Sequence, residues 1–339
     1  MKKNKVTIRE VAKEAGVSVA TVSRFLNNNS YISEDKEKKI QEVMDRLDYK
    51  PNEIARGLAK QKSNTIALII PDLTNPFFPD LVTAIEQVAK LNGYSLILVN
   101  SHEDDLQDAQ LWKSFRSRYI DGFILASFQV NEEVLKGLEG SKIPFVRVDR
   151  AVNFDSSNSI GVDNYHGAKM AVEHLIEIGC KKIAHISGPK SFSPSIDRVR
   201  GYLDTIRRLD KHELILLEGD FSLESGMQLT AKLMKEHQHV DGIFLANDLM
   251  ALGSLKALKT LNINVPKDVA VIGFDGIKLT EIVEPEITTI EQPIYNIGAA
   301  ATDKLIRLIE NDFEDIPNFD LNVRLIKRES TLGFPQKNK

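Results

Sequence analysis

Ten polar and aromatic residues stand where apolar runs of the sequence end, and their types suit the binding of a small polyhydroxylated molecule. Carboxylates, guanidinium groups and carboxamides form paired hydrogen bonds with neighbouring hydroxyls, and phenyl rings cover the C–H faces of a sugar ring. A closed pocket built from such groups excludes water and holds a small neutral polyol. The set comprises Asn75, Phe77, Phe78, Asp149, Arg150, Arg198, Phe221, Asn247, Asp275 and Gln292.

Each of these residues also has an ordinary structural explanation. The charged pair at 149–150 would meet surface charges, and the phenylalanines at 77–78 would belong to a core. Asn75 and Asn247 would cap helices. Their shared position at strand ends nevertheless favours a common site, because packing alone does not require seven loops to supply a matched polar and aromatic set.

The elements that would position this set begin at Thr65, where apolar runs start to alternate with amphipathic stretches. That alternation is typical of buried parallel strands joined by helices. Strands are expected at 65–71, 94–100, 122–127, 145–149, 182–188, 214–220, 242–248, 269–276 and 324–331, and helices at 78–91, 166–179, 195–209, 222–237 and 249–261. The two successive series predict an α/β fold with two doubly wound lobes, whose ligands bind beyond the carboxyl ends of the strands.

The first 62 residues differ from this pattern in both charge and periodicity. They carry 14 Lys and Arg against 9 Asp and Glu, while the remainder carries 30 against 39. The net charge of −4 would argue against a nucleic-acid partner, but it averages a basic head and an acidic body. A basic head points to an anionic partner, although a solvated basic tail would have the same composition.

Apolar spacing in the head predicts an all-α helix-turn-helix. Thr7 and Glu10 form a capping box at the start of a helix that Gly16 ends. Ser18 is expected to cap a second helix, at roughly 18–27, and Ser33 a third, at roughly 34–48.

The second of these helices would lie in the major groove of DNA. Arg24 suits a bidentate contact to guanine, and Val19 and Ala20 suit contacts to thymine methyl groups. Phosphate contacts are expected from Thr7, Ser18, Thr21, Ser23 and Asn27. For Thr7 and Ser18, helix capping alone is the alternative, and both roles are compatible.

A short helix is expected to follow at 53–59, because Pro51 breaks the third helix and Asn52 suits an N-cap. A helix of this length is unstable alone in water, so we expect DNA and a partner chain to order it. Leu58 would then enter the minor groove between base steps, or else pack on the body. The DNA-contacting set in this segment is Asn52, Ala55 and Leu58.

VTIREVAKEAGVSVATVSRFLNNN, followed by YKPNEIARGLAK, resembles the head and hinge of the LacI/GalR family of bacterial repressors. The resemblance is long and ungapped. It implies that Val19, Ala20 and Arg24 contact bases and that Leu58 wedges into a central minor-groove step. It also implies that a homodimer binds a palindromic operator with its two hinge helices side by side.

Residues 63–332 resemble the periplasmic sugar-binding proteins, most closely those of the ribose type. The contact motifs of that type stand here as NPFF (75–78), VDR (148–150), RVRGY (198–202), DF (220–221), ND (247–248), GFDG (273–276) and TIEQP (289–293). The resemblance implies that all ten residues of the opening set contact ribose. Val148 and Tyr202 depart from the usual Leu and Phe, and neither is a contact position.

No cofactor or metal site is expected, because the sequence has no P-loop, HExxH or GxSxG motif. The single cysteine, Cys180, suits a small core residue, and His237 and His239 suit a solvated loop. We expect a cytoplasmic protein, since neither a secretory signal nor a membrane-length apolar run is visible. Trp112 is expected to pack on the sheet or a dimer face, and no C-terminal leucine heptad supports a tetramer.

The expected organisation has four parts. A DNA-binding head spans residues 1–48, and a hinge with its linker spans 49–63. The N-terminal lobe comprises 64–163 with 291–322, and the C-terminal lobe comprises 164–290 with 323–333.

The resulting hypothesis is a repressor of a sugar operon that a small sugar, ribose in the first place, releases from DNA. Within this class, another sugar, a sugar phosphate or a phosphocarrier protein remains open as the effector. A binding module for transport is disfavoured by the basic head. An enzyme using Asp149 and Asp275 as acid and base is disfavoured because the site offers neither a nucleophile nor a metal.

Overall fold

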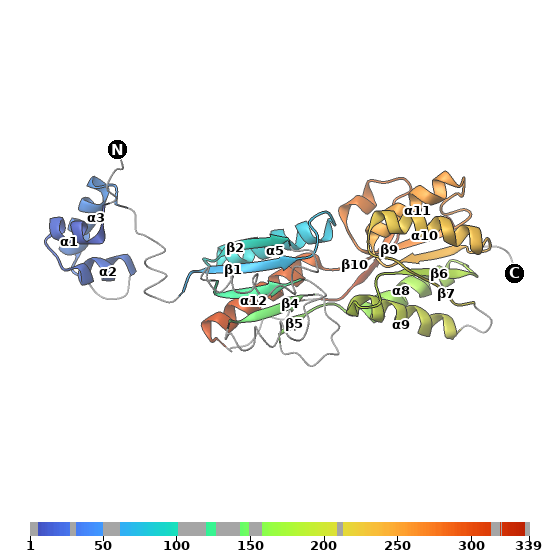
Figure 1. Cartoon of the computed structure of the whole chain (residues 1–339), viewed down its shortest axis with the longest axis horizontal. Coiled ribbons are helices and arrows are strands. Elements are labelled where there is room, and N and C mark those ends of the chain that lie inside the picture. Colours follow the sequence, from blue (N-terminus) through green and yellow to red (C-terminus); the bar gives the residue numbers. More distant parts are fainter. Residues whose placement is uncertain are drawn as a thin grey trace. The chain divides into compact units, whose positions relative to one another are not determined.

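The computed structural model describes most of the chain in two compact units, residues 1–63 and 64–339, each considered by itself (Figure 1). The described residues are 6–27, 32–49, 62–100, 120–126, 143–148, 158–208, 213–312, 319 and 321–335. The predicted hinge helix at 53–59, with Asn52, Ala55 and Leu58, lies outside them, as do Asp149, Arg150 and Trp112.

The first unit contains the predicted helix-turn-helix, built from α1 (Ile8–Ala15), α2 (Val19–Asn27) and α3 (Glu34–Arg46). The capping box is present, with the Glu10 amide donating to Thr7 Oγ1 at 3.4 Å and the Thr7 amide donating to Glu10 Oε2 at 2.7 Å. Gly16 ends α1 at φ 68°, a conformation that favours glycine. The helices enclose a small core of Val11, Ala12, Ala15, Val22, Ile40, Val43 and Met44.

One expectation for the head is wrong in detail. Ser33 stands at the N-cap of α3, but its side chain makes no capping hydrogen bond. The start of α3 is instead favoured by the acidic residues Glu34, Asp35 and Glu37, whose charges suit the positive end of the helix dipole. The helix also ends at Arg46, two residues earlier than the apolar spacing suggests.

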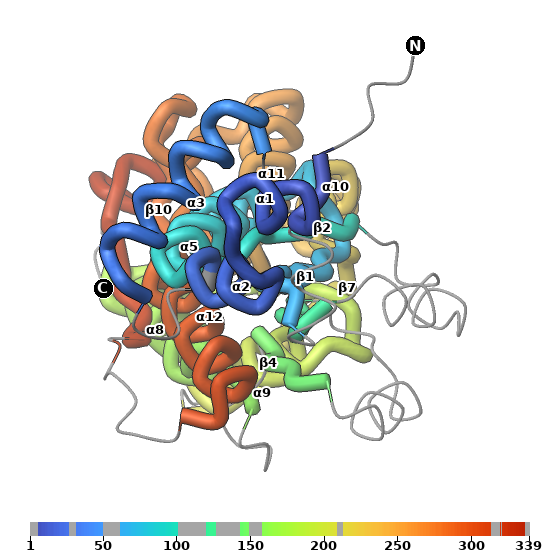
Figure 2. The backbone as a smooth tube through the Cα atoms, turned by 90° about the vertical axis from the view of Figure 1, so that its left-hand side faces the viewer, coloured from blue at the N-terminus to red at the C-terminus, as the bar shows by residue number. Residues whose placement is uncertain are grey.

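The second unit contains two sheets, of which the first defines the N-lobe. Its five parallel strands are β1 (Thr65–Ile70), β2 (Ser95–Asn100), β3 (Gly122–Leu125), β4 (Phe145–Val148) and β5 (Ser159–Ile160), in the order β2-β1-β3-β4-β5. Helices α5 (Phe77–Leu91) and α12 (Ile294–Glu310) are far apart in sequence but lie side by side (Figure 2). Helix α12 also packs against β3, β4 and β5.

The second sheet defines the C-lobe. Its strands are β6 (Ile183–Ser187), β7 (Ile215–Glu218), β8 (Gly242–Leu245), β9 (Ala270–Asp275), β10 (Thr288–Glu291) and β11 (Arg324–Ile326), in the order β11-β10-β9-β8-β6-β7. All pairings are parallel except that of β11 with β10. Helices α8 (Asn164–Glu177) and α9 (Ser193–Arg207) cover one face, and α10 (Leu223–Glu236) and α11 (Asp248–Thr260) cover the other (Figure 1).

The predicted α/β class with two parallel-sheet lobes is therefore confirmed. The eight strands expected between 65 and 276 each contain an observed strand, and the expected helices lie within two residues of their predicted bounds. Helix α12 was not expected from the sequence. Two strands were not expected, β5 and β10, and the final strand is shorter than the predicted 324–331. A 3₁₀ turn, η2 (Lys278–Glu281), also lies between β9 and β10.

Among the described elements, the chain crosses between the two lobes three times: between β5 and α8, between β10 and α12, and between α12 and β11. The carboxyl ends of β1, β7, β8, β9 and β10 lead directly to Asn75, Phe221, Asn247, Asp275 and Gln292, and β6 leads to α9, which carries Arg198. The fold thus brings these loops to a common edge, as expected for parallel sheets.

Candidate functional site

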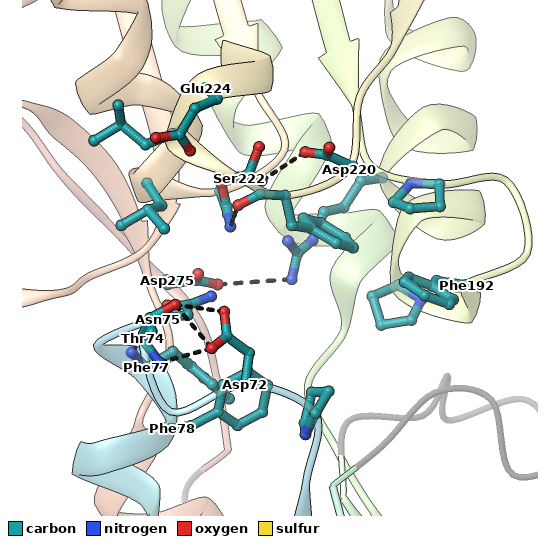
Figure 3. A pocket seen from close by; sticks show the side chains of 18 residues that line it. Asp72, Thr74, Asn75, Phe77, Phe78, Phe192, Asp220, Ser222, Glu224 and Asp275 are labelled. Atoms are coloured by element: carbon teal, nitrogen blue, oxygen red, sulfur yellow. Dashed lines mark hydrogen bonds and ion pairs between the residues drawn. The ribbon is translucent and has the colours of Figure 1, made fainter. Parts of the chain in front are cut away.

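A cleft of about 360 Å³ lies between the N-lobe and the C-lobe (Figure 3). Seven of the ten sequence-predicted effector residues line it: Asn75, Phe77, Phe78, Arg198, Phe221, Asn247 and Asp275. Gln292 stands behind Asp275, to which it is hydrogen-bonded. The remaining two, Asp149 and Arg150, lie outside the described residues.

The N-lobe side of the cleft is formed where β1 passes into α5. Phe77 and Phe78 are the first two residues of that helix, and their rings meet edge to face with centroids 5.2 Å apart. Asn75 Oδ1 accepts a hydrogen bond from the Phe77 amide at 3.1 Å, which fixes the turn before the helix. The two phenylalanines are also 4% and 5% exposed, so they serve the core and the cleft together.

Arg198 provides a buried positive charge on the C-lobe side. Its guanidinium lies over the Phe274 ring, 3.7 Å from the centroid. Nε donates to Asn164 Oδ1 at 2.9 Å, and Nη1 donates to the carbonyl of Ala246. Nη2 lies 3.9 Å from Asp275 Oδ1, a long ion pair between two buried groups (Figure 3). These contacts fix the orientation of the guanidinium, as bidentate recognition of hydroxyls requires.

Asp275 ends β9 with φ at 121°, a region that L side chains rarely adopt. Gln292 holds it twice, through its amide to the Asp275 carbonyl at 3.0 Å and through Nε2 to Asp275 Oδ1 at 2.8 Å. Gln292 Oε1 is buried and has no hydrogen-bond partner among the described residues. A carboxylate held beside an open carboxamide acceptor suits a ligand with adjacent hydroxyls.

Asn247 links two further residues of the cleft. Its side chain caps α11 by accepting from the Met250 amide at 2.9 Å, and Nδ2 donates to the carbonyl of Phe221 at 3.0 Å. Phe221 adopts φ 69°, so its backbone is held in a conformation unusual for a bulky residue. Asn247 therefore both caps α11 and lines the cleft.

The candidate nucleic-acid interface lies in the head, on α2 and the start of α1. Val19 is 41% exposed, and Ala20 and Arg24 are also exposed. Thr7 and Ser18 are exposed as well and make capping hydrogen bonds to the amides of Glu10 and Thr21. Thr21 and Ser23 are half-buried, and Asn27 is the last residue of α2.

Two protein-family models match this chain, and together they cover almost all of it. Residues 7–52 match the bacterial regulatory proteins of the lacI family. Residues 63–329 match the periplasmic binding proteins and sugar binding domain of the LacI family. The chain belongs to the LacI family.

Similar LacI-family proteins of known name or structure agree with this assignment. The ribose operon repressor of Halalkalibacterium halodurans is 39% identical over 328 residues, covering 96% of this chain and 97% of the relative. A lac repressor dimer bound to operator and the anti-inducer ONPF has 28% identity and a TM-score of 0.84, covering 97% and 100%. A LacI-family regulator from Enterococcus faecium with bound ribose has 29% identity and a TM-score of 0.70, covering 78% and 98%.

The predicted family resemblance is thereby confirmed. This family membership supports a regulator rather than an enzyme. In the described part of the chain, no cluster of three or more potential metal-binding side chains occurs. Cys180 is buried, as expected for a core residue, and His239 is exposed. No helix among the described residues combines the length and apolarity needed to cross a bilayer.

The cleft of this LacI-family chain also has lining residues that the sequence reasoning missed. They are Pro71, Asp72, Thr74, Pro189, Phe192, Pro194, Asp220, Ser222, Leu223, Glu224 and Leu249 (Figure 3). Phe192 stacks almost parallel on Phe221, with centroids 6.0 Å apart. Phe192 lies in the loop after β6, so the strand-end rule that selected the other residues also applies to it.

Three of the missed residues, Asp72, Asp220 and Glu224, place carboxylates around the cleft. Asp72 accepts from the Thr74 amide at 2.8 Å, and Asp220 accepts from the Ser222 amide at 2.9 Å. Burial raises the pKa of Asp220, but hydrogen bonds from Ser222 and Ser225 lower it by more than burial raises it. The pKa of Asp220 therefore lies below its usual value. Asp220 is therefore ionised at neutral pH and adds a negative charge to a lining that also contains the positive charge of Arg198.

Tyr202, which replaces the usual Phe of the ribose type, has a structural explanation. It is fully buried, its hydroxyl donates to the Ile183 carbonyl at 2.9 Å, and it accepts from the Ile215 amide at 3.1 Å. Burial raises its pKa to about 12, so the hydroxyl keeps its proton. The extra oxygen ties α9 to β6 and β7 without entering the cleft.

Proposed function

We propose that this chain is a transcription repressor of a sugar operon, which binds operator DNA as a homodimer and releases it when ribose enters the cleft. The observation that carries the proposal is the convergence of seven ribose-type residues on one cleft, with Gln292 bonded behind them. The similar proteins named above include a ribose operon repressor and a ribose-bound regulator.

In this proposal the head contacts DNA through two kinds of residue. Val19, Ala20 and Arg24 contact base edges. Thr7, Ser18, Thr21, Ser23 and Asn27 contact phosphates, and Asn52, Ala55 and Leu58 belong to the hinge contact in the minor groove.

Release requires that the sugar bind two conformations of the protein unequally. Residues of both lobes line the cleft, so a small ligand that contacts both sides favours their closure. In a dimer, closure shifts the N-lobes against each other, separates the hinge helices and weakens the minor-groove contact. A coupling free energy of about 1–3 kcal/mol would lower operator affinity by about 5–150-fold.

We further propose the four-part organisation stated from the sequence, with the head at 1–48, the hinge at 49–63 and the lobes divided near residues 163, 290 and 322. The membership of β10 in the C-lobe sheet and the packing of α12 on the N-lobe sheet support the second division. A cytoplasmic location belongs to the same proposal, because the operator is there.

The experiment that tests the effector is calorimetry of the full chain with ribose, other pentoses, hexoses and their phosphates. We expect ribose to bind with the highest affinity. The sugar phosphates should bind poorly, because the carboxylates of Asp72, Asp220 and Glu224 repel the negatively charged phosphate group. Preferential binding of a sugar phosphate would overturn the assignment. Failure of all these ligands to bind would refute a small sugar as the effector and leave a phosphocarrier protein as the alternative.

A titration of operator DNA with and without ribose tests the direction of regulation. The expected result is weaker operator binding in the presence of the sugar. If ribose strengthens operator binding, the sugar is a corepressor and the proposed release is wrong.

A further inference from the structure

Asp248 lies one residue beyond the cleft-lining Asn247, and it is not among the residues that line the cleft. We propose that Asp248 is a positioning residue, which holds the turn after β9 so that Asp275 faces the sugar. This inference rests on the proposed function, since it assigns Asp248 a role in that same effector site.

The side chain of Asp248 is completely buried and accepts hydrogen bonds at both carboxylate oxygens. Oδ2 accepts from the amides of Gly276 at 2.7 Å and Ile277 at 2.9 Å, the two residues that follow Asp275. Oδ1 accepts from Thr289 Oγ1 on β10 at 2.6 Å. One carboxylate therefore joins the first turn of α11, the turn after β9 and the neighbouring strand.

The turn needs such support, because Asp275 and Gly276 both have positive φ, at 121° and 81°. An L residue at φ 121° persists only where its surroundings dictate the conformation. Gln292 holds Asp275 from one side through its amide and its side chain. Asp248 holds the next two amides from the other side, so the direction of the Asp275 carboxylate is fixed before a ligand arrives.

Space for the carboxylate is provided by Gly273. A Cβ added at this glycine would lie 2.1 Å from Asp248 Oδ1, a distance that excludes any side chain. Burial raises the pKa of Asp248 above its usual value, although hydrogen bonds from Thr289, Ile277 and Gly276 and the charge of Arg328 lower it. A neutral side chain with the same acceptor oxygen should therefore be tolerated here.

The C-lobe contains a matched carboxylate at the other end of β8. Asp241 is buried and accepts from the amides of Lys181 at 2.9 Å and Lys182 at 2.8 Å, just before β6. It makes the same kind of bond in the same lobe but does not line the cleft. Asp241→Ala thus removes comparable support from the fold without touching the turn at 275–277.

The test measures ribose affinity by calorimetry on the full-length Asp248→Ala, Asp248→Asn and Asp241→Ala chains, with urea unfolding of each. We expect Asp248→Ala to lose ribose affinity by about tenfold or more, because it leaves two amides unpaired beside the site. Asp248→Asn should recover most of the affinity, since its amide oxygen still accepts from Gly276 and Ile277. Asp241→Ala should lower stability while changing the affinity less than about twofold.

Wild-type affinity in Asp248→Ala, an equal loss in Asp241→Ala, or no recovery in Asp248→Asn would each overturn the positioning role. If Asp248→Ala does not fold, Asp248→Ser replaces it, because a serine hydroxyl is too short to reach both amides.

Hydrogen exchange of the sugar-free chains separates this inference from the proposed function. We expect Asp248→Ala to speed exchange of the Gly276 and Ile277 amides, and Asp241→Ala to leave them unchanged. A wild-type chain that binds none of the sugars would refute the proposed function. Hydrogen exchange alone would then test the positioning role of Asp248. Unchanged exchange rates of the amides at 276 and 277 in Asp248→Ala would refute that role.

Discussion

Asp275 combines a buried carboxylate, a rare backbone conformation and two contacts to Gln292, all at the edge of the cleft. Replacing it with Ala removes a charged acceptor from the proposed sugar site, where each such hydrogen bond contributes about 1.5–3 kcal/mol. We expect Asp275→Ala to lower ribose affinity by at least about tenfold and to abolish the sugar response, while operator affinity stays unchanged.

Calorimetry with ribose and an operator-binding assay check both parts of this expectation. Asp303→Ala is the control, because it removes a carboxylate that pairs with Arg307 on α12 and does not line the cleft. Normal induction of the Asp275 variant would remove this residue from the site.

His185, in the middle of β6, gives the folded chain a pH dependence. Its ring is fully buried, stacks on Phe244 with centroids 4.4 Å apart and is bonded through Nδ1 to the Phe244 carbonyl at 2.9 Å. Burial lowers its pKa from 6.5 to about 4, the bond to Phe244 opposes this, and the charge of Arg198 adds to it. The ring is therefore neutral in the folded chain at pH 7.

Because the unfolded chain takes up this proton at higher pH than the folded chain, stability is complete above pH 6.5 and falls as the pH drops toward 4. The loss attributable to this residue approaches about 3 kcal/mol, at about 1.36 kcal/mol per pKa unit. Urea unfolding between pH 7 and 4.5 should show a shallower decline in His185→Asn than in the wild type. The exposed His239→Asn should retain the wild-type decline, and identical slopes in all three chains would contradict the assignment.

Residue types at strand ends were sufficient to predict seven lining residues of the cleft, because a parallel sheet brings those ends together. They were insufficient for Asp248, whose partners are backbone amides 28 and 29 positions away. Such bonds depend on the pairing of β8 with β9 and leave no signature in side-chain type. Phe192 was missed for a different reason, since it lies five residues beyond the end of β6, at the N-cap of α9.

Helix α2 exposes Val19, Ala20 and Arg24 to solvent. Its residues Val22, Phe25 and Leu26 pack into the head core. Arg24 is exposed on this helix, whereas Arg46 at the end of α3 forms an ion pair with Glu14 of α1. Both are arginines of the head, but only Arg24 lies on the helix proposed to enter the major groove.

We expect Arg24→Ala to relax sequence preference at one base pair of each half-site, at a cost of about 1–3 kcal/mol for the cognate operator. Arg46→Ala should keep the same preference. Competition binding of operators with single base changes provides the measurement. A uniform loss of affinity across all sequences would make Arg24 a phosphate contact instead.

Most elements could be predicted from apolar periodicity, and those that could not have clear physical reasons. Strand β5 has only two residues, Ser159 and Ile160, and exists because it pairs with β4 at the edge of the sheet. Strand β10, TTIE, is mostly polar in sequence yet lies between β9 and β11, where the Thr288 hydroxyl bonds to the Thr331 hydroxyl and the Thr289 hydroxyl donates to the Asp248 carboxylate. Both strands are thus specified by their pairing partners in the sheet rather than by an apolar pattern of their own.

At the scale of the whole molecule, sugar binding and operator binding are linked through one protein and must affect each other equally. If ribose lowers operator affinity by a given factor, operator DNA lowers ribose affinity by the same factor, which we expect to lie at about 5–150-fold. Calorimetry of ribose with the free chain and with the preformed operator complex measures the second factor. Equal ribose affinity in both states would mean that the sugar does not regulate DNA binding.

The three crossings between the lobes also determine the order in which a ribosome can complete them. The strands of the N-lobe are finished at Ile160, but α12, which packs on β3, β4 and β5, ends at Glu310. At about 5–20 residues per second, translation of the intervening segment of about 150 residues takes about 8–30 s. During that time the apolar sheet face that α12 will cover is without its helix, so the N-lobe, although begun first, cannot be completed until most of the C-lobe has been made.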